Sequence, residues 1–125
     1  MRIFKFGGAS VKDAEGIKNV YDVLQKAGYE DVLLVVSAMG KTTNALEVVI
    51  KNYFDKSAEL NSSVQEVKKY HNQILLDLFE DEKNEVFAAV NGQFSDLEYF
   101  LAHNKSPNYN FVYDQIVSYG ELIST

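Results

Sequence analysis

A lysine, two glycines and a serine lie within six residues near the start of the chain, in the segment FKFGGASV at residues 4–11. A lysine ammonium is a compact charge that can bind phosphate, and glycine lets a ligand approach the backbone closely. The segment could therefore hold phosphate groups. Each residue also has a plainer explanation: Lys5 as an exposed edge-strand lysine, Gly7 and Gly8 as a tight turn, and Ser10 as a helix N-cap.

A second segment, SAMGKTTN at residues 37–44, combines a glycine, a lysine and two threonines. Its GKTT portion resembles the end of a phosphate-binding P-loop. The full P-loop pattern requires another glycine five positions before Gly40, and this chain has Val35 there. The first segment does not match the GxGxxG fingerprint of dinucleotide-binding domains either. Neither of these two nucleotide signatures is therefore present.

Two predicted strands would carry these segments. Residues 2–6, RIFKF, are extended in character, and residues 32–36, VLLVV, have the apolar pattern of a strand buried on both faces of a parallel sheet. An amphipathic helix lies between them and ends near Gly28. Its apolar face consists of Ala14, Ile17, Val20, Tyr21, Leu24 and Ala27. Strand, helix and strand in this order predict a right-handed βαβ unit.

The carboxyl ends of parallel strands meet at one edge of a sheet, and ligands of open α/β sheets bind there. Both segments leave their predicted strands at that edge and lead into helices. Backbone amides, two helix N-termini and Lys5 would therefore converge on one crevice. Such an arrangement favours an anion such as a polyphosphate.

The rest of the chain is predicted to be helical, so the predicted fold class is α/β, with several helices after the parallel βαβ start. Capping boxes at Asn44 and Glu47, and at Ser63 and Glu66, mark the starts of two helices. The four predicted helices cover residues 45–56, residues 64–78, residues 83–103 and a segment that begins near residue 111.

A strand as apolar as VLLVV needs neighbours on both edges, and only one other strand is predicted. The final helical pattern still continues at Thr125, without the glycine or proline that commonly follows a helix. We therefore expect the chain to be the N-terminal part of a longer domain.

The composition excludes several classes of protein. The chain has 125 residues, enough for one domain or part of one, and its 46% apolar and 24% charged residues are ordinary for a folded protein. A net charge of −6, with no basic cluster beyond Lys68 and Lys69, speaks against nucleic-acid binding. The lack of cysteine excludes disulfides and thiolate metal sites. No signal peptide or membrane span is predicted, so a cytoplasmic protein without a membrane partner is expected.

The remaining polar residues give no sign of a metal site. His71 and His103 have no acidic or cysteine partner at metal-ligand spacing, so both are predicted to be ordinary helix-surface residues. The acidic run EDEK at residues 80–83 lacks the alternating oxygen ligands and central glycine of a calcium loop. It is predicted to be a solvated helix junction.

Three segments, KFGGASV, VVSAMGKTTN and VSYGELIST, resemble three successive signatures of aspartate kinase, within the amino acid kinase fold family. Their order and spacing match, and the resemblance covers residues 1–125. It implies the N-terminal portion of a kinase catalytic domain, with the rest of that domain and the regulatory ACT domains lying beyond it. It also implies transfer of the γ-phosphoryl group of ATP, with Mg²⁺, to the side-chain carboxylate of L-aspartate. The product would be 4-phospho-L-aspartate, at the start of lysine, threonine and methionine biosynthesis.

The same resemblance assigns roles to the residues at the motif positions. Lys5 would be the catalytic lysine that contacts the transferring phosphate, where its charge offsets the negative charge on the phosphoryl oxygens. The ATP phosphates would be bound by Lys5, Phe6, Gly7, Gly8 and Ser10. L-Aspartate would be bound by Ser37, Thr43 and Glu121, the last through the substrate's ammonium group.

Two details of the motifs lead to further expectations. Gly120 is expected to leave space for a ligand beside Glu121, at a helix-propensity cost of about 1 kcal/mol. The family usually has threonine or serine where this chain has Ala9, so one hydroxyl is missing from the first loop. Its loss would cost about 1 kcal/mol of transition-state binding if that hydroxyl touches phosphate, and little if it only caps the turn.

Two other functions stay open at this point. Another amino acid kinase, of the glutamate or acetylglutamate type, would share the first lysine and glycines, although the SYGE segment argues against it. A non-catalytic module could use the same crevice to bind a phosphorylated metabolite or a partner. For an aspartate kinase, we expect the isolated chain to lack useful kinase activity and the full-length enzyme to form a homo-oligomer.

Overall fold

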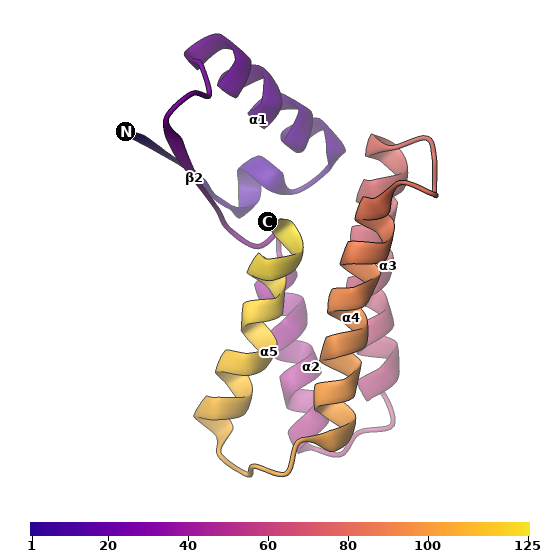
Figure 1. Ribbon diagram of the computed structural model, residues 1–125. Helices are drawn as coiled ribbons and strands as arrows, with labels where there is room; N and C mark the ends of the chain where they lie inside the picture. The colour runs from indigo at the N-terminus through magenta and orange to yellow at the C-terminus, as the bar shows by residue number, and fades with distance from the viewer.

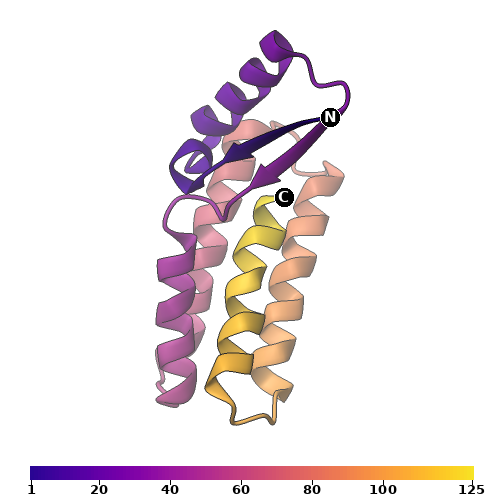
Figure 2. The same ribbon diagram turned by 90° about the vertical axis from the view of Figure 1, so that its left-hand side faces the viewer.

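The computed structural model describes all 125 residues, which form two regions (Figure 1). The order along the chain is β1 (Arg2–Phe6), the 3-10 turn η1 (Gly8–Val11), α1 (Ala14–Ala27), β2 (Val32–Val36), α2 (Thr42–Phe54), α3 (Leu60–Leu78), α4 (Glu85–His103) and α5 (Tyr109–Ser124). The βαβ unit sits at one end of a bundle formed by the last four helices (Figures 1 and 2). The predicted α/β class, with a parallel βαβ start followed by helices, is confirmed.

The two strands pair in parallel over their full length. Phe6 packs into a small core beside α1, whose buried members are Val11, Val20, Met39 and Ile74. In β2, however, Leu33, Leu34 and Val35 remain 48%, 42% and 41% exposed. The prediction that residues 32–36 are buried on both faces is therefore wrong for this chain, because β1 is the only strand beside β2.

The four-helix bundle holds the larger core. Its buried members are Leu46, Val49, Ile50, Val64, Val67, Leu75, Val90, Phe94, Leu97, Val112, Ile116 and Ile123. Burying one side chain of this size contributes about 1.5–3 kcal/mol, so the bundle is the more strongly stabilised region. Ile74 of α3 belongs to the small core of the βαβ unit instead. Helix α3 therefore contributes side chains to both cores.

The helix boundaries confirm the prediction for α1 and correct the predicted starts of α2 and α3. α1 ends before Gly28, whose φ of 83° favours glycine. α2 and α3 each begin at least two residues before Asn44 and Ser63, so the predicted capping boxes do not form. Both side chains lie inside helices, where the Ser63 hydroxyl donates to the carbonyl oxygen of Leu60 at 2.7 Å. A serine hydroxyl can either cap a helix or bond to a backbone carbonyl within one, and sequence spacing does not distinguish these two arrangements.

The last two helices begin with asparagine caps. The Asn84 side chain accepts a hydrogen bond from the N–H of Val86, and the Asn108 side chain accepts one from the N–H of Phe111. α5 therefore begins two residues earlier than predicted. None of the helices combines the length and the apolar composition that a membrane span requires.

His71 lies in the bundle core. Its side chain is 2% exposed, its Nδ1 lies 2.8 Å from the carbonyl oxygen of Val67, and its ring packs edge-on against Phe94. The surface prediction for His71 is wrong, because Val67, His71 and Ile74 follow one another along the buried stripe of α3. Burial lowers the pKa of His71, and the hydrogen bond with Val67 acts in the opposite direction. His103 is exposed, as predicted.

Candidate active site

Backbone hydrogen bonds join the two loops that follow β1 and β2. The N–H of Ser37 donates to the carbonyl oxygen of Phe6 at 3.0 Å, and the N–H of Gly40 donates to that of Gly8 at 3.0 Å. The segments FKFGGASV and SAMGKTTN therefore lie side by side at the carboxyl edge of the strand pair. This edge is where ligands of α/β sheets bind.

The two glycines of the first loop have different surroundings. A Cβ on Gly8 would lie 2.8 Å from the carbonyl oxygen of Gly40 and 3.0 Å from that of Ala38, so no side chain fits there. A Cβ on Gly7 would meet no atom within 4 Å. Gly8 is thus required by the packing of one loop on the other, whereas Gly7 leaves the backbone open to an approaching ligand.

Lys5 is an exposed cation at this edge. It lies opposite Val35 in the strand pair, and its side chain is on the face away from Phe6, because successive strand residues alternate in direction. Neither of the two ion pairs in the structure involves Lys5. Its ammonium group is therefore uncompensated and available to an anion beside the glycine loops.

Phe6 and Ser10, both predicted to contact phosphate, are placed differently. The Phe6 ring packs into the small core, so only its backbone faces the loop. Ser10 is exposed in η1, and its hydroxyl makes no hydrogen bond within the chain. The N-cap explanation for Ser10 is wrong, because Asp13 caps α1 by accepting a hydrogen bond from the N–H of Gly16 at 2.8 Å.

The second loop leads directly into α2, whose first N–H groups have no side-chain cap. Gly40 has a φ of 55°, a left-handed conformation that favours glycine. Thr42 is buried and its hydroxyl donates to the carbonyl oxygen of Met39. Thr43, half-buried beside it, makes no side-chain hydrogen bond. The Thr42 N–H donates to the Met39 carbonyl oxygen at 3.0 Å, so the Thr43 hydroxyl and the N–H groups of Thr43 and Asn44 are the groups left free for a ligand.

Gly120 brings α5 against the second loop. A Cβ on Gly120 would lie 3.0 Å from the Ala38 Cβ and 3.3 Å from side-chain atoms of Leu46 and Thr42. The expectation that Gly120 leaves space for a ligand is therefore wrong, because three side chains occupy that space. The close packing places Glu121, which is exposed and unpaired, in the turn of α5 that adjoins the loop.

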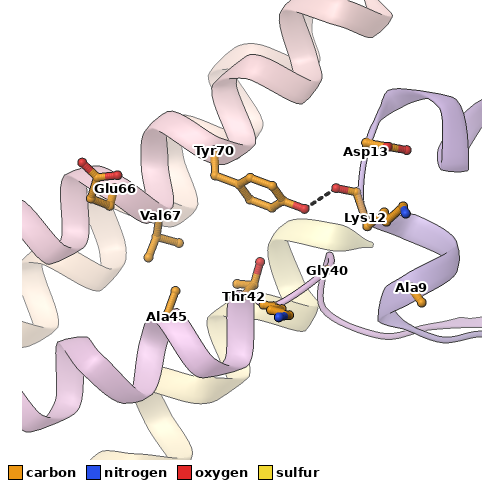
Figure 3. A pocket seen from close by; sticks show the side chains of 10 residues that line it. Ala9, Lys12, Asp13, Gly40, Thr42, Ala45, Glu66, Val67 and Tyr70 are labelled. Atoms are coloured by element: carbon orange, nitrogen blue, oxygen red, sulfur yellow. Dashed lines mark hydrogen bonds between the residues drawn. The ribbon is translucent and has the colours of Figure 1, made fainter.

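A pocket of about 760 Å³ lies between η1, the second loop, the start of α2 and α3 (Figure 3). Its lining residues are Ala9, Lys12, Asp13, Gly40, Lys41, Thr42, Ala45, Glu66, Val67 and Tyr70. None of the residues predicted to bind aspartate lines it. The pocket adjoins the predicted site through Ala9 of the first segment and through Gly40, Lys41 and Thr42 of the second.

Sequence reasoning singled out Lys41, as part of GKTT, but missed Lys12, Asp13 and Tyr70 of this pocket. Lys12 directly follows the first segment and could have been noted from its position. Tyr70 could not, because it lies in a helix far along the chain. Its hydroxyl donates to the carbonyl oxygen of Lys12 (Figure 3). Burial, and secondarily the charge of Asp13, raises the pKa of Tyr70, so the hydroxyl stays a protonated donor at neutral pH.

Comparison with known proteins places the whole chain in one family. A model described as "Amino acid kinase family" matches residues 1–125. The chain is 31% identical, over 98% of its length, to aspartokinase 1, chloroplastic, of Arabidopsis thaliana, of which it covers 22%. It is 30% identical over 98% of its length to bifunctional aspartokinase/homoserine dehydrogenase 1, chloroplastic, of the same plant, and 28% identical over 98% to bifunctional aspartokinase/homoserine dehydrogenase 2 of Escherichia coli (strain K12). It spans 14% and 15% of those two proteins.

Proposed function

Because the chain belongs to the amino acid kinase family, we propose that it supplies the phosphate-facing part of the active site of an aspartate kinase. The enzyme would transfer the γ-phosphoryl group of ATP to the side-chain carboxylate of L-aspartate, giving 4-phospho-L-aspartate. The observation that carries the proposal is the direct contact between the two glycine loops, through the Gly40 to Gly8 hydrogen bond, next to an unpaired Lys5.

The proposed chemistry requires little covalent participation by the protein. A carboxylate oxygen of aspartate attacks the γ-phosphorus, the bond from that phosphorus to the bridging oxygen breaks, and ADP leaves. Lys5 would offset the charge on the phosphoryl oxygens, and the open backbone at Gly7 would donate hydrogen bonds to them. Mg²⁺, which in such sites is held mainly by phosphates and water, would neutralise further charge.

The substrate side of the site supports an acceptor with a free ammonium group, such as L-aspartate. Glu121 would pair with the ammonium group of the amino acid, and the hydroxyls of Ser37 and Thr43 would bind its polar groups. An N-acetylated amino acid has no ammonium group, so Glu121 would then face it without a partner. We also propose that residues 1–125 are the N-terminal portion of the kinase domain. The exposed apolar strand β2 and the small share of each relative that the chain covers support this arrangement. The expected homo-oligomer and cytoplasmic location stay predictions.

The decisive test is an ADP-release assay on the natural protein that carries this chain, with L-aspartate, L-glutamate or N-acetyl-L-glutamate as acceptor. We expect turnover with aspartate alone, and a loss of about 100-fold in kcat for Lys5→Ala, the effect typical of removing one group that stabilises transition-state charge. Lys105→Ala, which removes an exposed lysine from the loop between α4 and α5, is the matched control and should leave kcat unchanged.

Three other outcomes would contradict the proposal. Turnover with glutamate or its acetylated form would indicate another amino acid kinase. Binding of a phosphorylated metabolite without turnover would indicate a non-catalytic module. Aspartate-dependent turnover by the isolated 125-residue chain, abolished by Lys5→Ala, would show that this portion alone is a complete kinase.

A further inference from the structure

Tyr70 reaches from the bundle to the first glycine loop. It belongs to α3, and its hydroxyl donates to the backbone carbonyl oxygen of Lys12, which directly follows η1 (Figure 3). The acceptor is a main-chain atom, so the bond fixes the course of the loop whatever side chain stands at residue 12.

The same hydroxyl lies against the second loop. A Cβ on Gly40 would be 2.5 Å from the Tyr70 Oη and 3.4 Å from the Lys12 Cβ. Only a glycine leaves room for this contact. The Gly40 N–H donates in turn to the Gly8 carbonyl oxygen, so Tyr70, Gly40 and Gly8 form a continuous chain of contacts across both loops.

The position of Tyr70 on α3 is itself fixed by the core. Val67 and His71 beside it are each 2% exposed, and Ile74, one turn further on, is 4% exposed. The Tyr70 side chain is still 37% exposed. The Tyr70 side chain thus extends from a well-packed helix to the edge of the βαβ unit and is not part of the core.

We propose that Tyr70 is a positioning residue that holds the loop at residues 7–12 and the Gly40 turn in the relative arrangement needed to bind phosphate. This inference rests on the kinase function proposed above. Phosphoryl transfer depends on preset donors, and small displacements of such groups lower rates steeply. Tyr70 acts through the two loops and does not itself touch the reacting atoms.

The test uses the natural protein that carries this chain, with the variant Tyr70→Phe, which removes one oxygen and keeps the ring. Tyr53→Phe is the matched control. The Tyr53 hydroxyl also makes one tertiary hydrogen bond, from Asn104 Nδ2 at 2.9 Å, but at the far end of the bundle. Three quantities are measured in each protein: the melting temperature, kcat/KM for ATP, and the hydrogen-exchange rate of the Gly40 amide.

We expect both variants to lower the melting temperature equally. Only Tyr70→Phe should lower kcat/KM for ATP, by about fivefold, the factor corresponding to loss of one hydrogen bond of ordinary strength. Only Tyr70→Phe should speed exchange of the Gly40 amide, because the loop that carries its acceptor is then less constrained.

The outcomes separate this inference from the proposed function. If the wild-type protein phosphorylates aspartate and the two variants have the same kcat/KM and the same Gly40 exchange rate, the role of Tyr70 is overturned and the kinase function stands. If the wild-type protein does not phosphorylate aspartate, the proposed function is overturned. In that case faster Gly40 exchange in Tyr70→Phe supports Tyr70 as the residue that fixes the two loops, and unchanged exchange overturns that as well.

Discussion

The four-helix bundle and the βαβ unit differ sharply in how well they are packed. The bundle has a core of twelve buried side chains drawn from four helices, whereas the βαβ unit has four buried side chains, one of them contributed by α3. The residues proposed to bind phosphate belong to the βαβ unit, which is the less well packed of the two regions. They are held in place by contacts with the bundle, through Tyr70 and Gly120 in particular. The bundle therefore contains most of the buried core, and the βαβ edge carries the residues proposed to bind phosphate.

The largest expected effect tests this division directly. Phe94→Ala, in the centre of the bundle, should lower the free energy of unfolding by about 3–5 kcal/mol, because it leaves a cavity at a fully buried position. Val35→Ala in β2, a side chain 41% exposed, should lower it by about 1 kcal/mol or less. Urea unfolding followed by circular dichroism measures both. Equal losses would mean that the two regions share one core.

A smaller effect is expected where the bundle meets the second glycine loop. Gly120→Ala adds a methyl group to a space filled by Ala38, Leu46 and Thr42, and should lower the free energy of unfolding by about 1–3 kcal/mol. Gly92→Ala in α4, where a Cβ meets nothing within 4 Å, is the control and should raise it by about 0.5–1 kcal/mol. Stabilisation by both substitutions would show that α5 does not pack closely on the loop.

The smallest expected effect is a change in the free energy of unfolding with pH, caused by His71 in the bundle core. Because burial lowers the pKa of His71 in the folded chain, the folded state favours the neutral ring. The resulting stability is present above the unfolded pKa of about 6.5 and is lost as the pH falls through the lowered folded value. Because His71 binds a single proton, it can change the free energy of unfolding by at most about 1.4 kcal/mol per pH unit.

Urea unfolding between pH 8 and pH 5 measures this dependence. The difference in stability between the wild-type chain and His71→Gln should narrow as the pH falls. His103→Gln, which replaces an exposed histidine, should follow the wild-type curve. A constant difference between the wild type and His71→Gln would show that His71 is not titrating in this way.

The elements with a strong local signal were predictable. The periodic apolar face and the final glycine define α1, and the apolar run at residues 32–36 defines β2. The starts of α2 and α3 were not, because serine, threonine and asparagine can either cap a helix or lie within one. His71 was misplaced, although its spacing from Val67 and Ile74 is the helical repeat that marks a buried stripe.

By itself, the sequence determined the types of group at the candidate site. These are a lysine near the end of one strand, glycines after it, hydroxyls after the next strand, and a carboxylate in the last helix. Only the tertiary structure decided which glycine lacks room for a side chain, which threonine hydroxyl is occupied, and that Tyr70 meets a carbonyl 58 residues away. The physical reason is that residue types and spacing follow from local chemistry. Steric room and hydrogen-bond partners depend on which distant segments the fold brings together.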